Sequence, residues 1–273
     1  MMNTFTTIFI ALSLCLGVNP LLDYSASGRN ENSGKGHVVF IGDSNTWNGG
    51  DDCSNPKAWS YWMVKNMLPA TARSYARSGA TWTNNAATVA DTASYFEVLN
   101  DQNVLYNQIL RLKGEVKAGR QLVPDYIFLS GGTNDAWFSA KRPGLYNSTV
   151  EQAYLRPMTT ATTPAQATSL AEAVRLNLML LKEAFPNARI IVVGPPYTTK
   201  ASKETIEKVA DIIQQSARKS GVECIRIEKN CGIDPVKEKQ KPQLTSDGTH
   251  TNNKGAWQIA RCVYDYLAFS NPQ

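Results

Sequence analysis

Histidine is scarce in this sequence: His37 and His250 are the only two among 273 residues, and no Cys-x-x-Cys pair occurs. Zinc sites usually combine histidine and cysteine ligands at short spacings, so the sequence predicts no metal site. Residues 28–35 approach a phosphate-binding loop, but five residues separate the glycines instead of about four. We therefore expect neither metal nor cofactor, and chemistry that rests on side chains alone.

The sequence also lacks a block of one charge sign. Its 28 Lys and Arg against 23 Asp and Glu give a net charge of +5, and the charges alternate, as in residues 237–241. Nucleic-acid-binding domains usually gather their basic residues into a patch or stripe. Nucleic acid is therefore not an expected partner.

No hydrophobic run is long enough for a stable membrane span. The longest, residues 5–18, falls short of the ~20 residues that a spanning helix needs. Its length is typical of the apolar core of a secretory signal, although no Lys or Arg precedes it. We expect residues 1–27 to be a signal peptide and the mature protein to be exported to the periplasm or the extracellular space. A lipid anchor at Cys15 is the alternative, but Leu14 stands where a small residue is expected.

Four cysteines follow the expected leader: Cys53, Cys224, Cys231 and Cys262. In an oxidising compartment they could pair in three ways, or they could stay buried as thiols. Cys224 and Cys231 flank one predicted strand, and seven extended residues span roughly 23 Å. That pair is the least expected bridge.

Short apolar runs alternate with helical patterns along the rest of the chain. Strands are predicted at residues 37–41, 73–77, 125–129, 189–193 and 224–227. Helices are predicted from Asn55-Pro56 to about Asn66, over 99–116, from Thr163-Pro164 to Phe185, and around 206–213 and 256–267. Parallel strands need crossover connections, and the crossover helices cover both faces of the sheet. The expected fold is a three-layer α/β/α sandwich with a five-stranded parallel sheet, in one domain over residues 28–273.

Residues 136–162 interrupt this alternation. They are rich in Thr, Tyr and Arg and show no firm periodicity. Loops of this length are usually functional. We interpret the segment as an insertion on the substrate side of the domain.

Ligands of open α/β sheets bind beyond the carboxyl ends of the strands, so the residues after each strand are the candidates for chemistry. These are Gly42-Asp43-Ser44, Gly79, Gly132-Thr133-Asn134-Asp135 and Asp247-Gly248-Thr249-His250. A serine hydroxyl becomes a good nucleophile when a neighbouring base takes its proton. His250 is the candidate base, because His37 begins a strand at the opposite end from Ser44. Asp247 can accept from the His250 ring and fix its tautomer.

These four blocks, in this order, resemble those of the SGNH, or GDSL, hydrolase family. The resemblance covers residue 38 to the C-terminus and implies a flavodoxin-like fold. It implies an oxyanion hole made by the N–H groups of Ser44 and Gly79 and the side-chain amide of Asn134. Asn45 departs from the pattern, because the first block often has Leu there. Asp43 and Asp135 are interpreted as acids that brace the loops.

Three tryptophans, Trp47, Trp82 and Trp137, each follow a predicted site residue by three positions. Flat aromatic faces can pack against sugar rings, so we expect these indoles to border the pocket. The expected activity is that of a secreted serine esterase acting on a small-molecule or glycan ester, with acetyl on a carbohydrate as the favoured substrate. A lipolytic acylhydrolase or thioesterase, a sugar O-acetyltransferase and a non-catalytic carbohydrate-binding module stay open as alternatives.

Overall fold

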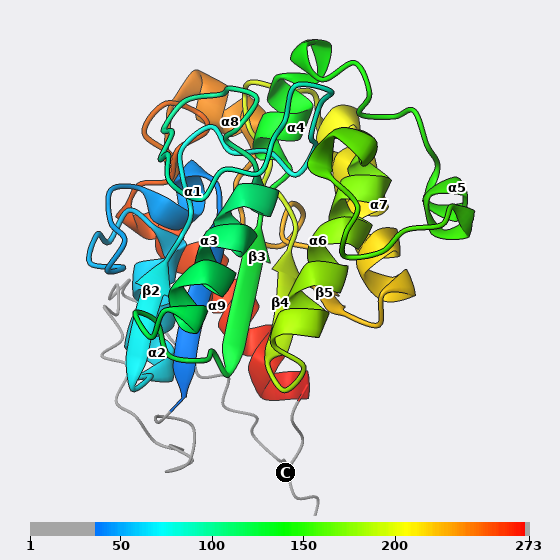
Figure 1. Cartoon of the computed structure of the whole chain (residues 1–273). Coiled ribbons are helices and arrows are strands. Elements are labelled where there is room, and N and C mark those ends of the chain that lie inside the picture. Colours follow the sequence, from blue (N-terminus) through cyan, green and yellow to red (C-terminus); the bar gives the residue numbers. More distant parts are fainter. Residues whose placement is uncertain (1–35, 271–273) are drawn as a thin grey trace, which may run out of the picture. The chain divides into compact units, whose positions relative to one another are not determined.

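The computed structural model describes residues 36–270, and within them a five-stranded, wholly parallel sheet has the order β2-β1-β3-β4-β5 (Figure 1). The expected signal peptide and Cys15 lie outside the described residues. The strands are β1 (His37–Gly42), β2 (Thr71–Ser74), β3 (Tyr126–Ser130), β4 (Arg189–Val193) and β5 (Glu223–Ile225). Two crossovers place β2 and β3 on either side of β1, so chain order reverses there. The expected α/β fold is confirmed.

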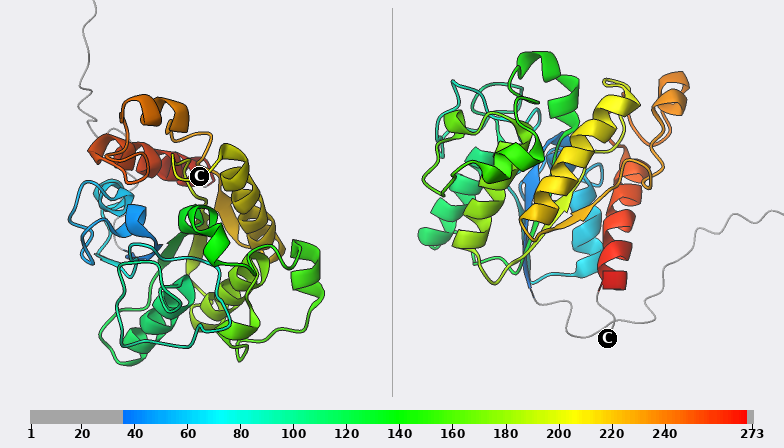
Figure 2. Two further views of the ribbon diagram at one scale, coloured as in Figure 1. Left: turned by 90° about the horizontal axis from the view of Figure 1, so that it is seen from above. Right: turned by 90° about the vertical axis from the view of Figure 1, so that its right-hand side faces the viewer.

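Helices cover both faces of the sheet, which gives the three expected layers (Figure 2). One layer contains α3 (Leu105–Lys117), α6 (Leu170–Ala184) and α7 (Lys203–Lys219), and the other contains α2 (Trp59–Met67) and α9 (Asn253–Ser270). Alternation along β1 explains the split, because successive strand side chains point to opposite faces. Val39 and Ile41 pack under the first layer, whereas Val38 and Phe40 pack under the second.

Local capping moves two helix starts from their predicted positions. Ser169 and Glu172 form a capping box, so α6 begins at Leu170, and Thr163-Pro164 opens only the short 3-10 turn Pro164–Gln166. Asn55 closes a turn by accepting from the Ala58 N–H, and α2 begins at Trp59. In both cases a proline that suits a first helical turn was mistaken for the start of the following helix.

A long segment without helix or strand, residues 75–104, connects β2 to α3, where the sequence predicted helix from residue 99. Two buried arginines hold it. Arg142 donates to the Asn100 carbonyl at 2.9 Å, and Arg111 donates to the carbonyls of Thr92 and Ser94. Side chains from outside the segment therefore hold it in place without regular structure of its own.

The predicted insertion, 136–162, is partly helical. It contains the end of α4 (Thr133–Trp137), the 3-10 turn Ser139–Lys141 and α5 (Val150–Leu155), which begins with a Thr149/Gln152 capping box. Val150 and Ala153 pack against Ala171 of α6, and the Tyr154 hydroxyl donates to the Ser216 carbonyl of α7. The second half of the segment thus packs against α6 and α7. The placement of the insertion on the substrate side stays a prediction.

All four cysteines of the described part are unpaired thiols. Cys224 packs against the layer of α3, α6 and α7, whereas Cys231 is buried in the opposite layer. The two lie on different faces of the sheet, in keeping with the expectation that they do not pair. Among residues 36–270, no helix has the length and apolarity to cross a bilayer.

Candidate active site

Ser44 stands at the carboxyl end of β1, as the first residue of the short helix α1 (Ser44–Trp47). Asp43 caps this helix, with Oδ1 accepting from the Asn45 N–H at 3.1 Å. Gln108 of α3 bonds both the N–H and the carbonyl of Gly42 at 2.9 Å. A Cβ on Gly42 would lie 2.5 Å from the Ser130 carbonyl oxygen, so glycine is required there. The turn that presents Ser44 is therefore fixed from both sides.

Asp247 and His250 lie together in the loop between α8 (Pro235–Gln240) and α9, beyond β5. Asp247 Oδ2 is 2.7 Å from His250 Nδ1, and Oδ1 accepts from the His250 backbone N–H at 2.8 Å. Burial alone would raise the pKa of Asp247, but the hydrogen bonds from His250 and from the Thr249 N–H outweigh it and lower the pKa. The carboxylate is therefore ionised at neutral pH and orients the ring.

Glu238 of α8 bonds the residues that immediately precede this turn. Its buried carboxylate accepts from the N–H groups of Gln243, Leu244 and Thr245 and from the Thr245 hydroxyl. Thr245 in turn accepts from the Gly248 N–H at 2.9 Å. These bonds outweigh the cost of burial and lower the pKa of Glu238, so a stable negative charge anchors the loop that carries Asp247.

The loop after β4 supports the turn from the side. Thr199 donates its N–H to the Gly248 carbonyl at 2.9 Å, and the Thr198 and Thr249 hydroxyls are 2.6 Å apart. Gly248 has a φ of +85°, and a Cβ there would lie 2.2 Å from Thr199 Oγ1. Only glycine fits this position.

Asn45 connects the two halves of the site. Its Nδ2 donates to the Thr249 carbonyl at 3.2 Å, and its Oδ1 accepts from the Thr251 N–H at 3.0 Å. These partners flank His250. Among residues 36–270, no hydrogen bond within 3.5 Å joins Ser44 to His250. The two segments are joined by the contacts of Asn45 and by a bond from Asn48 to the Thr251 carbonyl at 3.3 Å.

Gly79 and Asn134 follow β2 and β3 as predicted. Gly79 has a φ of +77°, and a Cβ there would lie 2.5 Å from the Leu99 backbone nitrogen. A side chain at position 79 is therefore excluded by another part of the same segment, 75–104. The Asn134 amide donates one hydrogen to the Ala80 carbonyl at 2.9 Å, which orients the side chain and leaves its second N–H for another acceptor.

Two buried acids lie beside the predicted nucleophile and oxyanion donor. Asp135 accepts from the Trp82 and Thr83 N–H groups and the Thr83 hydroxyl, and burial raises its pKa. Burial also raises the pKa of Asp43 to about 7, with the charge of Asp135 adding to the effect and His250 opposing it. Both acids brace loops, as expected from the sequence. The acid that bonds the His250 ring, at Nδ1, is Asp247.

The three tryptophans differ in their surroundings. Trp82 is fully buried in the core beside Gly131, which corrects the expectation that it borders the pocket. Trp47 and Trp137 are half-buried. The Trp47 indole N–H donates to Asp51, and the Trp137 ring stacks on Phe138 with its centroid 5.6 Å from the Lys200 amine. Equal spacing in sequence did not give equal exposure, because the backbone N–H groups of Trp82 and Thr83 both bond the buried Asp135.

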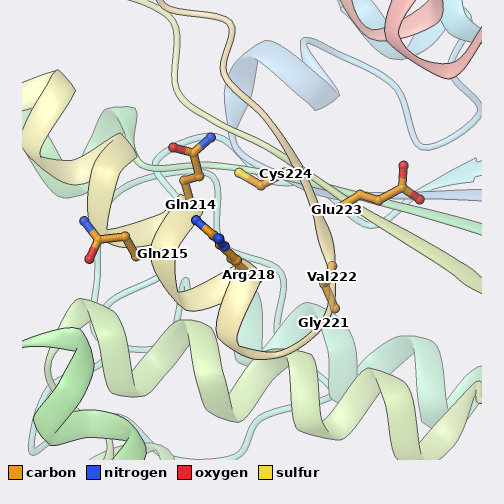
Figure 3. Close-up of a pocket in the computed structure, with 7 residues that line it drawn as sticks. All are labelled: Gln214, Gln215, Arg218, Gly221, Val222, Glu223 and Cys224. Atoms are coloured by element: carbon orange, nitrogen blue, oxygen red, sulfur yellow. The ribbon is translucent and has the colours of Figure 1, made fainter. Parts of the chain in front are cut away.

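Neither His37 nor the hollow described below is part of the candidate active site. His37 bonds Thr71 at the amino end of β1, far along the strand from Ser44, as predicted. A hollow of about 490 Å³ lies between α7 and residues 221–224, and the side chains that line it include Arg218, Glu223 and Cys224 (Figure 3). None of the predicted site residues lines it. Within residues 36–270 no group of three His, Cys, Asp or Glu side chains is placed to hold a metal ion.

Sequence reasoning missed the residues that support the site. Asn45 was noted as a departure from the family pattern but was given no chemical part. A polar residue where leucine is common was the available signal, since a buried amide needs partners. Gln108 gave no signal, because its partner Gly42 is 66 positions away in sequence. Glu238 gave none, because its partners are backbone groups of a nearby irregular loop, which carry no sequence pattern.

Comparison with known proteins shows the family and the fold. The model of the GDSL-like lipase/acylhydrolase family matches residues 40–258. No curated protein sequence matches the chain. Among solved structures, a protein from Lactobacillus plantarum is similar at 15% identity, with a TM-score of 0.57, over 87% of this chain and 98% of that one.

Two further structures share the fold. The lipase/acylhydrolase from Enterococcus faecalis is 16% identical, with a TM-score of 0.50, over 87% of this chain and 98% of that one. The acetyl xylan esterase AlAXEase is 17% identical, with a TM-score of 0.51, over 85% and 99%. At these identities the likeness is one of fold.

Proposed function

Because the chain belongs to the GDSL-like lipase/acylhydrolase family and is thus a carboxylic ester hydrolase, we propose that it is a serine esterase that removes acetyl groups from a carbohydrate through Ser44, His250 and Asp247. The observation that carries the proposal is the pairing of Asp247 with both the ring and the backbone of His250, at the sheet edge that also presents Ser44.

In the proposed mechanism, Ser44 Oγ attacks the ester carbonyl carbon while His250 Nε2 takes the hydroxyl proton. Asp247 holds the Nδ1 proton in place and stabilises the imidazolium that forms. Collapse of the tetrahedral intermediate breaks the C–O bond, and His250 returns its proton to the departing alcohol. Water then attacks the acyl-enzyme with His250 again acting as base, releasing the acid and restoring Ser44.

The negative charge on the intermediate's oxygen needs donors that are already oriented. The Ser44 N–H begins helix α1, and the first N–H groups of a helix have no partner within it. Asn134 keeps one amide hydrogen free beyond its bond to Ala80. Together with the Gly79 N–H, these groups are the proposed oxyanion hole.

The choice of a carbohydrate ester is supported by Trp47 and Trp137, which stay partly exposed and follow Ser44 and Asn134 by three positions on α1 and α4. Indole faces suit sugar rings. The fold likeness to an acetyl xylan esterase is consistent with such a substrate but concerns that protein.

A specific observation favours a second candidate, hydrolysis of longer acyl chains. Val98 is 66% exposed and lies against Gly79, and Val89 and Tyr95 of the same segment are also exposed. These exposed apolar side chains belong to the segment that also carries Gly79, and apolar surface of this kind suits a longer acyl chain. A chain-length series of nitrophenyl esters, run beside acetylated oligosaccharides, separates the two. Preference for acetyl supports the first candidate, and preference for eight carbons or more supports the second.

Two alternative functions on the same fold, acetyl transfer and carbohydrate binding without catalysis, can be told apart by separate measurements. An acetyltransferase would pass the acyl group to an added sugar alcohol faster than to water, and a binding module would retain oligosaccharides without releasing acetate. We also propose export, on the strength of the apolar residues 5–18. The N-terminal sequence of the mature protein tests this, and an intact leader in the purified native protein would contradict it.

A further inference from the structure

Asn45 is buried and bonds both chain neighbours of His250: the Thr249 carbonyl through Nδ2 at 3.2 Å and the Thr251 N–H through Oδ1 at 3.0 Å. We infer that Asn45 is a positioning residue, which sets the distance and direction of His250 relative to Ser44. The inference rests on the proposed function, since it assigns a purpose to the contact between nucleophile helix and base. It concerns a position that the family resemblance leaves to leucine in many members.

The chemistry of the contact calls for a primary amide. A carbonyl oxygen and an N–H group face α1 from either side of His250, so the bridging side chain must donate and accept at once. Leucine can do neither. With leucine at position 45, the Thr249 carbonyl and Thr251 N–H would each lose a partner, which is costly because both residues are buried.

The position of Asn45 in the chain makes it effective. Asp43 caps the Asn45 N–H at 3.1 Å, so the two residues that flank Ser44 both point their side chains into the protein. The residue after the nucleophile thus holds the residues before and after the base. The segments are separated by 204 and 206 positions in sequence, and no local turn could bring them together.

The other hydrogen bonds to the turn that carries His250 connect it to itself, to the loop after β4 and to the end of α1. Ser246 donates to the His250 carbonyl at 2.8 Å within the turn itself, and Thr198 ties Thr249 to the loop after β4. Asn48, at the end of α1, donates to the Thr251 carbonyl at 3.3 Å and also to the Lys57 carbonyl. Asn45 is therefore the α1 residue that spans His250, and its loss should loosen the turn toward Ser44 without unfolding it.

The test compares Asn45→Leu and Asn45→Ala with a matched control, Asn107→Leu. Asn107 is also buried, and its side-chain amide likewise bonds backbone groups: it accepts from the Asp91 N–H at 2.9 Å and donates to the carbonyls of Val89 and Gln102. It holds the segment 75–104. The chain has two histidines, so a His37→Gln background leaves one imidazole signal in the NMR spectrum.

In the Asn45 variants we expect kcat for a small aryl acetate to fall by about 10- to 100-fold, the scale of a misplaced reacting group, with little change in KM. The His250 ring signals should shift or broaden, and the Thr251 amide should exchange with solvent at least tenfold faster. Asn107→Leu should leave the ring signals as in the parent.

Folded Asn45 variants with parental kcat and unchanged ring signals would overturn the inference. If neither variant folds, exchange in the unmodified protein decides: the Thr251 amide should be as protected as the amides of β1, and rapid exchange would overturn the inference. Failure of the proposed function has a different signature, because an unmodified protein without esterase activity would still show the effect of Asn45 on the ring signals and on exchange.

Discussion

Asp247 contacts His250 at two points, the ring Nδ1 at 2.7 Å and the backbone N–H at 2.8 Å, so one carboxylate fixes both the base and the turn that carries it. The bonds to the His250 N–H and ring outweigh the effect of burial and lower the pKa of Asp247. The same contacts that make the acid a good partner for an imidazolium also keep it charged.

Asp247→Asn should separate these two contacts. The asparagine oxygen can still accept from the His250 N–H, but its NH2 group would face Nδ1 and favour the tautomer that places a proton on Nε2. We expect kcat to fall by about 10³- to 10⁴-fold with the fold intact. Steady-state kinetics on an aryl acetate, with circular dichroism as the control for folding, measure this, and a loss below tenfold would argue for another acid.

Ser44→Ala removes the proposed nucleophile. Because the members of a triad act as a unit, we expect ester hydrolysis to fall by about 10⁴- to 10⁶-fold. Ser44 is buried, with 7% of its surface exposed, but the change removes a single hydroxyl oxygen, so thermal stability should stay close to that of the parent. Activity within tenfold of the parent would reject covalent catalysis by this residue.

Asn134→Ala removes one proposed oxyanion donor together with its bond to the Ala80 carbonyl. A donor used mainly in the transition state contributes to kcat, so kcat should fall by about 10²- to 10³-fold while KM changes little. A rise in KM with kcat unchanged would show that Asn134 binds the ground state instead.

The sequence was sufficient for the sheet and for the order of the site motifs. Buried central strands are short apolar runs that end in glycine or a turn, and β4 was predicted at its observed bounds. The edge strand β2 begins two residues and ends three residues earlier than predicted, because it is half-exposed and has a weak pattern. The Thr149/Gln152 capping box of α5 was readable but went unnoticed without apolar periodicity around it.

What could not be predicted depends on partners distant in sequence. Nothing near Asn45 indicates Thr251, and nothing near Trp82 indicates that Asp135 draws its backbone inward. The segment 75–104 is held by Arg111 and Arg142, which follow it in the chain. Local patterns therefore located the motifs, while tertiary contacts decided which side chains reach the surface.

Asp43 should make stability depend on pH. Its pKa is raised by burial from 3.8 to about 7, so the folded state binds a proton that the unfolded state releases above pH 4. Folding stability from this group is therefore present at low pH and is lost as pH rises from about 4 to 7. Asp43→Asn, which keeps an oxygen to cap Asn45, should remove this dependence.

The measurement is denaturant unfolding of parent and Asp43→Asn at pH 5 and pH 7. One group with this shift contributes a slope of about 1.4 kcal/mol per pH unit, so the difference in unfolding free energy between the proteins should move by about 2 kcal/mol in favour of the variant at pH 7. An equal difference at both values would mean that Asp43 stays ionised when buried.

Two tryptophans that the sequence treats alike should behave differently when truncated. Trp82 is fully buried, so Trp82→Ala should lower the free energy of unfolding by about 3–5 kcal/mol and affect all substrates together. Trp137 is half-buried and stacks on Phe138 beside the site, so Trp137→Ala should cost little stability. If its exposed face contacts a sugar, activity on acetylated oligosaccharide should fall by about tenfold, the scale of one aromatic contact, while hydrolysis of a small aryl acetate changes little. Parallel losses on both substrates with Trp137→Ala would assign this indole to support of α4 and would shift the search for substrate contacts to Val98 and the segment 75–104.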